Sequence, residues 1–79
     1  MTDPSDDPPR LSKRQRECLQ GIAEGLTSAE IAAALGLSPR TVDHYVEDAC
    51  DKLKVRSRAH AVAEAIRWGQ ITSPSKVSP

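Results

Sequence analysis

The stretch TSAEIAAALGLSPRTVDHYVEDACDKL, residues 27–53, decides the fold. Thr27 followed by Glu30 forms a capping-box pattern, which predicts a short helix over residues 28–35. Gly36 comes directly after that helix, and glycine ends helices because it tolerates the left-handed backbone conformation. The first half of this stretch therefore predicts a helix with both of its ends marked.

A second helix follows after only a few residues. Ser38 is a favourable N-cap, and Pro39 fits the first helical position, where its missing N–H costs nothing. The helix is predicted over residues 39–53 because its apolar residues recur with helical spacing. Its inward stripe is Val42, Val46, Ala49 and Leu53. Two helices joined by a short turn with a glycine predict a helix-turn-helix, with Leu37 filling the angle between them.

One more helix is predicted on each side of this motif. Ser12 and Gln15 form a second capping box, so a helix should run from there to about Glu24. Ser57 caps a fourth helix that should reach Trp68. Its predicted inward stripe is Ala59, Val62 and Ile66, with Ala63 alongside. Because no strand pattern is found, the predicted fold is all-α: a four-helix bundle with a central helix-turn-helix and no β wing.

The two ends of the chain differ in composition from the middle. Residues 1–10 are rich in Asp and Pro, and residues 72–79 are rich in Ser and Pro, so we expect both to be disordered tails. One helix-turn-helix domain is expected over residues 11–71. At 79 residues the chain has room for one domain at most.

Several classes of function fit the sequence poorly. Cys18 and Cys50 are far apart and lack a CxxC pattern, so we expect core thiols and neither a zinc site nor a disulfide. No nucleophile, paired carboxylates or metal-ligand spacing indicates an enzyme, and no cofactor is expected. The chain has no membrane-length apolar run and no signal peptide, which points to the cytoplasm.

The quoted stretch and its surroundings resemble the LuxR/GerE-type DNA-binding domain over about residues 11–71. The matching pieces are Leu11-Ser12, Glu17, Leu19, Ala23-Glu24-Gly25, Glu30-Ile31-Ala32, Leu35-Gly36-Leu37-Ser38, Thr41-Val42, Lys52-Leu53, Val55, Arg58 and Ala61-Val62. The resemblance implies a four-helix domain that binds promoter DNA as a dimer. It also implies that the third helix recognises DNA and the fourth supplies the dimer contact. Full-length members usually carry a receiver or ligand-sensing domain, for which this chain has no room. The chain therefore resembles the stand-alone members or the output half of a two-domain protein, and we expect a stand-alone member.

The charge of the predicted recognition helix departs from this pattern. Basic and acidic residues balance at 11 each over the whole chain, whereas DNA-binding domains are usually basic. Residues 39–53 carry a formal net charge of −2, from Arg40 and Lys52 against Asp43, Glu47, Asp48 and Asp51. Three readings stay open: an ordinary solvated face, a face that binds protein instead of DNA, and an unusual operator with few phosphate contacts from this helix.

The candidate DNA-binding residues fall into two groups. Base or backbone contacts are predicted along the recognition helix, where Asp43 can accept from cytosine and Thr41 can meet a phosphate. Basic residues around the helix are expected to position the domain on phosphates. The full set is Lys13, Arg14, Ser38, Arg40, Thr41, Asp43, His44, Tyr45, Glu47, Lys54, Arg56 and Arg58.

The fourth helix is the predicted dimer interface, through His60, Glu64, Arg67 and Trp68. Trp68 is either the lid of the core or an interface anchor. The favoured hypothesis is a transcription regulator that binds double-stranded DNA as a homodimer. The alternative is an interaction module whose acidic helix binds another regulator. In that case the expected heteromeric partner is a different protein and not DNA.

Overall fold

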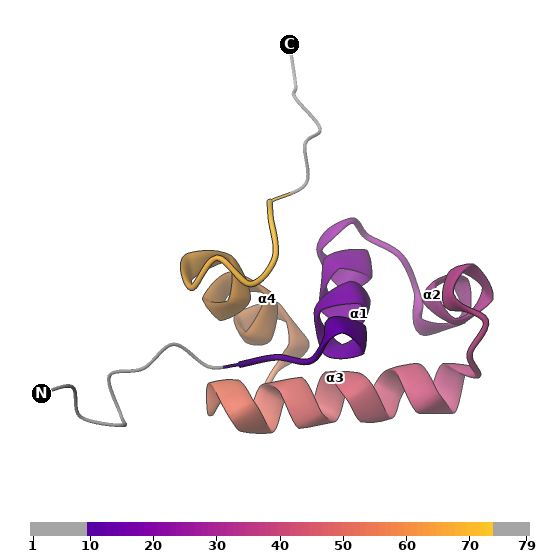
Figure 1. The fold of residues 1–79 in the computed structure, drawn as a ribbon, viewed down its shortest axis with the longest axis horizontal. Coiled ribbons are helices and arrows are strands. Elements are labelled where there is room, and N and C mark those ends of the chain that lie inside the picture. The colour runs from indigo at the N-terminus through magenta and orange to yellow at the C-terminus, as the bar shows by residue number, and fades with distance from the viewer. Residues whose placement is uncertain (1–9, 74–79) are drawn as a thin grey trace, which may run out of the picture.

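The computed structural model describes residues 10–73, which form four α-helices (Figure 1). Their bounds are α1 Lys13–Ala23, α2 Ser28–Leu35, α3 Pro39–Leu53 and α4 Arg58–Arg67. No strand occurs within residues 10–73. The predicted all-α fold with a central helix-turn-helix is confirmed. The tails predicted for residues 1–10 and 72–79 fall almost wholly on residues 1–9 and 74–79, outside the described residues, so they stay predictions.

The N-terminal caps predicted from sequence are all present. The Ser12 and Thr27 side chains accept from the backbone N–H groups of Gln15 and Glu30, and both capping boxes are complete. Ser38 and Ser57 cap α3 and α4 in the same manner. Four helix starts are thus fixed by side chains adjacent in sequence, which is why their positions could be predicted.

The turn of the helix-turn-helix depends on one glycine. Gly36 ends α2 in the left-handed conformation, with φ of 71°. The next backbone N–H, from Leu37, donates to the Ala32 carbonyl at 2.9 Å, which satisfies a carbonyl of the last turn. Leu37 packs against the core, as predicted.

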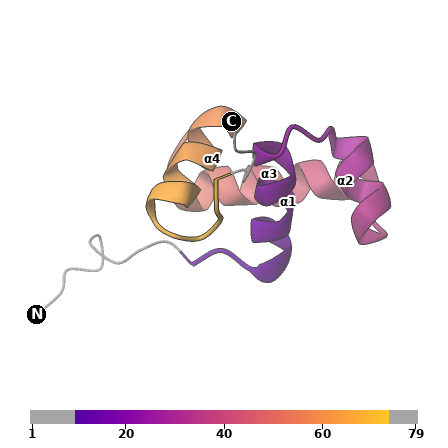
Figure 2. The ribbon, with the colours of Figure 1, turned by 90° about the horizontal axis from the view of Figure 1, so that it is seen from above.

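Helix α3 forms one side of the domain, and the other three helices lie together on its opposite side (Figure 1). Seen from above, α1 lies between α4 and α2 (Figure 2). The predicted stripe on α3 is confirmed, since its four residues are its buried ones. They join a core whose largest fully buried side chains are Leu19, Ile31, Val42, Val46 and Cys18. One face of α3 therefore makes the core and the other is left open.

The predicted inward stripe of α4 is partly wrong. Its buried residues are Ala61 and Ala65, whereas Ala59 and Ala63 are exposed. The other predicted stripe residues, Val62 and Ile66, are half-buried and pack against the edge of the core. Small side chains let two helices approach closely, so alanine occupies the centre of this contact and the larger residues flank it. The prediction placed Val62 and Ile66 at the centre of the buried face. In the structure α4 is rotated about its axis relative to that prediction, with Ala61 and Ala65 at the centre.

Two further features of the described residues bear on function. Cys18 and Cys50 are free thiols, and burial raises the pKa of each above its ordinary value of 9.0. None of the helices within residues 10–73 is both long and apolar enough to cross a membrane.

Candidate nucleic-acid interface

The side of α3 that faces away from the core is covered by no other described helix (Figure 1). Since α3 has 15 residues, it is about 22 Å long, a length that suits a groove-binding helix. Its exposed side chains include Arg40, His44, Glu47, Asp48 and Asp51. Three of the residues predicted to contact DNA from this helix, Arg40, His44 and Glu47, are thus exposed, whereas Thr41, Asp43 and Tyr45 are half-buried.

The first turns of α3 carry its polar and basic side chains. Arg40 and His44 are exposed. Thr41 is half-buried, and its backbone N–H donates to Ser38 Oγ at 3.1 Å. The Ser38 and Thr41 hydroxyls also lie 2.9 Å apart and share a hydrogen bond. Both hydroxyls therefore already help to define the start of the helix.

Asp43 has partners within the chain that the sequence did not suggest. Its Oδ1 accepts from Ser28 Oγ at 2.6 Å and from Arg58 Nη2 at 2.7 Å. The hydrogen bond from Ser28, followed by that from Arg58, holds the pKa of the Asp43 carboxyl below its ordinary value of 3.8. The predicted base-contacting acid and a predicted phosphate-binding arginine are thus paired with each other.

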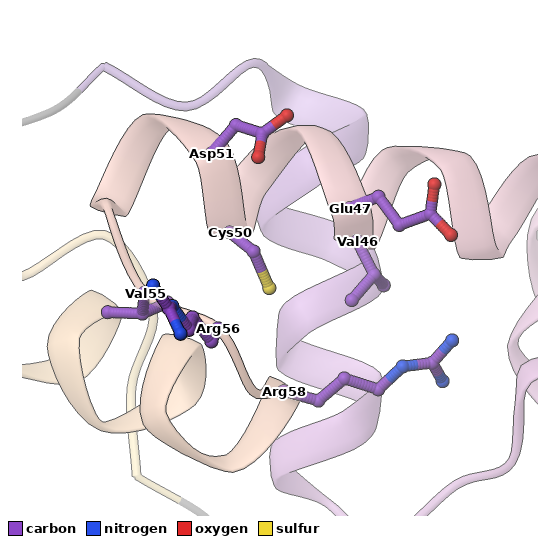
Figure 3. A pocket seen from close by; sticks show the side chains of 7 residues that line it. All are labelled: Val46, Glu47, Cys50, Asp51, Val55, Arg56 and Arg58. Atoms are coloured by element: carbon purple, nitrogen blue, oxygen red, sulfur yellow. The ribbon is translucent and has the colours of Figure 1, made fainter.

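The second half of α3 is acidic. Figure 3 shows a pocket of about 380 Å³ where this half of α3 meets the connector and the start of α4. Its apolar lining is Val46, Cys50 and Val55, and its charged lining is Glu47, Asp51, Arg56 and Arg58. Because Arg58 is paired with Asp43, Arg56 is the arginine of this lining that is left to offset the charges of Glu47 and Asp51.

The remaining residues predicted to contact phosphates differ in whether they form ion pairs within the domain. Arg14 forms an ion pair with Glu17 at 3.1 Å, within one turn of α1. Lys13, Lys54 and Arg56 are exposed and form no ion pair with any residue from 10 to 73. Lys54 also ends α3 in the left-handed conformation, with φ of 59°.

A positioning contact between α1 and α3 was missed in the sequence. Lys52 Nζ donates to Gln15 Oε1 at 3.0 Å and to the Arg10 carbonyl at 3.1 Å. Gln15 is only 6% exposed, and its Oε1 also accepts from the Ser12 backbone N–H at 2.8 Å. The capping box alone explained Gln15 in the sequence, so no local signal pointed to Lys52. This contact ties the last turn of α3 to the start of α1.

The predicted dimer residues on α4 are not equally accessible. His60 and Arg67 are exposed, and Glu64 is half-buried. Trp68 is half-buried and packs against the core, with the Arg67 guanidinium 4.9 Å from the centre of its ring. Tyr45 of α3 likewise packs against the core. Both large aromatic side chains therefore have a role in packing.

Comparisons with known proteins agree with this geometry. The chain is 38% identical over 63 residues to the spore germination protein GerE of Bacillus subtilis, which covers 80% of this chain and 85% of GerE. The solved structure of the transcription factor GerE superposes with a TM-score of 0.76 at 29% identity, over 78% of this chain and 92% of that one.

Longer relatives match over their corresponding part only. The transcriptional activator LuxR of Aliivibrio fischeri is 39% identical over 81% of this chain, and the probable transcriptional regulatory protein NarL of Mycobacterium tuberculosis is 49% identical over 75% of it. The chain spans 26% and 27% of the length of these two proteins.

The family model of the bacterial regulatory proteins of the luxR family matches residues 9–65, which is well over half of the chain and includes the whole helix-turn-helix. This is a family of transcription factors and not of enzymes, in agreement with the sequence. The fold and the family match lead to one conclusion: the chain belongs to the luxR family of bacterial regulatory proteins.

Proposed function

We propose that this protein is a transcription regulator that binds promoter DNA as a homodimer, with α3 in the major groove. The observation that carries the proposal is the open outer side of α3 in a domain of this family. Helix-turn-helix proteins place the second helix of the motif in the major groove. Because its target is bacterial DNA, the protein would act in the cytoplasm.

The distribution of charge along α3 supports recognition by its first half. Residues near the N-terminus of a recognition helix contact base edges in helix-turn-helix proteins. In this half Arg40 and His44 are exposed, and its one acid, Asp43, is paired with an arginine. The exposed acids begin only at Glu47. We therefore propose base contacts from Arg40 and His44 and none from the acidic half of the helix.

Phosphate contacts are proposed for the free basic residues around α3. Lys13, Lys54 and Arg56 are exposed, and their charges are not offset by ion pairs within residues 10–73. Such contacts set the position of a domain on the duplex without selecting its sequence. Few of them are present, so the salt dependence of binding should be shallow for a protein of this class.

The dimer is proposed through the outward side of α4. Ala59 and Ala63 are exposed there, flanked by His60 and Arg67. A symmetric dimer needs a patch that complements its own copy, and alanines let two helices cross closely. The exposure of Ala59 and Ala63 thus supports a dimer contact with a small apolar centre and charged residues at its rim.

The test is a fluorescence titration of a duplex from the region upstream of the gene against a random duplex of equal length. We expect tighter binding to the upstream duplex at about 50 mM salt and a fall in affinity towards about 200 mM. Equal binding to both duplexes at low salt would contradict sequence-specific recognition. The slope of affinity against salt gives the number of phosphates neutralised.

A second candidate function is supported by the three exposed acids of α3. Glu47, Asp48 and Asp51 form no ion pair with any residue from 10 to 73. Such a face complements a basic protein surface, so this candidate is a module that binds another regulator.

The two candidates predict different effects for the double change of Glu47 and Asp51 to lysine, each measured in its own assay. A DNA-binding face should gain non-specific affinity for duplex DNA, because two repulsive charges become attractive. A protein-binding face should lose its partner in a pulldown. Recovery of a protein partner by the unchanged chain, and its loss in the variant, would favour the second candidate.

A further inference from the structure

Three helices meet at one small ring of polar contacts. Ser28 is the first residue of α2, Asp43 lies in the first half of α3, and Arg58 is the first residue of α4. Asp43 Oδ1 accepts from Ser28 Oγ at 2.6 Å and from Arg58 Nη2 at 2.7 Å. Arg58 Nη1 also donates to Ser28 Oγ at 3.2 Å, which closes the ring.

The ring lies at the surface that we propose for DNA. The side chains of Arg58 and Asp43 are 45% and 42% exposed, so both charges can be reached by a bound duplex. Arg58 also lines the pocket beside the second half of α3, where its side chain extends across the view in Figure 3. Its guanidinium is nevertheless directed to a carboxylate of its own chain. An arginine held in this way offers little net charge to a phosphate.

We propose that Asp43 limits the strength of DNA binding through Arg58 and does not contact a base. It keeps the Arg58 guanidinium on the protein, which withholds one phosphate contact that every DNA sequence would share. Because phosphate contacts strengthen binding to all sequences alike, withholding one lowers the affinity for specific and non-specific DNA by a similar factor. This inference rests on the proposed function, since it concerns the strength of DNA binding.

The test variant is Asp43→Asn, which keeps the shape of the side chain and removes its charge. We expect the released Arg58 to contact a phosphate, so non-specific affinity should rise by about tenfold and the salt slope should steepen by about 0.9. Affinity for the upstream duplex should rise by a similar factor, so the ratio of specific to non-specific affinity should stay about the same.

Two further variants separate the release of Arg58 from the simple loss of an acid. Asp48→Asn removes the same charge from an exposed position on the same helix without releasing an arginine. It should change the salt slope less than Asp43→Asn does. In an Arg58→Ala background, Asp43→Asn should no longer steepen the slope, because the responsible cation is gone.

A base-contacting Asp43 would behave differently on operators with single base-pair changes. Aspartate accepts from cytosine, whereas asparagine pairs with adenine, so Asp43→Asn would then change the preferred base at one position. Such a switch, without a steeper salt slope, would overturn the inference. Equal rises in affinity for every operator variant, together with a steeper salt slope, support it.

The outcomes also separate this inference from the proposed function. If the unchanged protein binds no duplex at low salt, the proposed function fails, and the inference fails with it. If the unchanged protein binds DNA but the steeper slope of Asp43→Asn persists in the Arg58→Ala background, only the inference fails.

Discussion

Lys54 adopts a backbone conformation that glycine adopts more easily. Its φ of 59° places it in the left-handed region, where it ends α3. A side chain with a Cβ crowds the following carbonyl in that region, and glycine avoids this strain. The chain therefore carries a local cost at the point where α3 turns towards α4.

We expect Lys54→Gly to stabilise the domain by about 0.5–1 kcal/mol, because relief of the strain exceeds the added freedom of the unfolded chain. Urea unfolding of the purified domain measures the change. Lys54→Ala is the matched control, since it removes the same charge but keeps the Cβ. A glycine variant no more stable than the alanine variant would contradict the strain.

The contacts of Asp43 predict a specific response to pH. A lowered folded-state pKa means that the carboxylate stabilises the fold at pH values above 3.8 and that this contribution is lost as the pH falls through the lower folded value. In an NMR titration of the carboxyl carbon, Asp43 should titrate below 3.8, and Ser28→Ala should raise its pKa because the largest cause of the shift is removed. The unchanged Asp43 titrating at 3.8 or above would show that the ring is not formed in solution.

At the scale of the helices, Gly21 decides how closely α1 and α2 pack. A Cβ at this position would lie 2.6 Å from Ile31 Cγ1 and 2.8 Å from Ile31 Cδ1. Ile31 is 2% exposed and branched at Cβ, so it has little room to move. A glycine within a helix normally lowers the stability of that helix. At position 21 the missing Cβ leaves room for Ile31, so α1 and α2 can pack closely.

We expect Gly21→Ala to destabilise the domain by about 1 kcal/mol, because overpacking outweighs the gain in helix propensity. In an Ile31→Ala background the same change should stabilise the domain, since the obstructing atoms are absent. Thermal and urea unfolding of the four proteins give both effects. Equal effects of Gly21→Ala in the two backgrounds would exclude the close approach as the cause.

The inward face of α4 is a second feature of the same scale. The sequence placed Ala59 and Ala63 inward, whereas the packing buries Ala61 and Ala65. Apolar spacing locates a helix well, but it cannot rank two faces when alanine occurs on both. The fit against neighbouring helices made that choice, and it left an apolar centre on the outside of the domain.

For the whole molecule, we expect the exposed face of α4 around Ala59 and Ala63 to form the dimer contact. We expect Ala63→Glu to weaken the homodimer by about tenfold or more, because two buried like charges would face each other across the symmetry axis. Sedimentation velocity over a range of concentrations measures the association. Ala33→Glu on α2 adds the same charge at another exposed alanine and should leave the association unchanged. A dimer that survives Ala63→Glu would exclude this surface as its contact.

The sequence by itself determined where the helices begin, where the central turn lies and which side of α3 is buried. These features depend on neighbours in the chain: caps such as Ser12 and Thr27, the glycine at position 36, and the regular spacing along α3. Local chemistry is enough to specify them, because the interacting groups are at most four residues apart or repeat along a single helix.

Which charges are paired within the domain depends on the packing of the helices and could not be predicted from the sequence. Asp43 and Arg58 are 15 residues apart, and Lys52 and Gln15 are 37 apart, so no local pattern pairs them. From the sequence, Asp43 was one of four acids on the helix and a candidate base contact, and Arg58 was a candidate phosphate contact. Packing of α2, α3 and α4 brings the charged atoms of Asp43 and Arg58 to 2.7 Å from each other. At that distance the two opposite charges largely cancel each other's field at a more distant group, such as a phosphate. Charge counted along a chain cannot show such cancellation, because it depends on which helices meet.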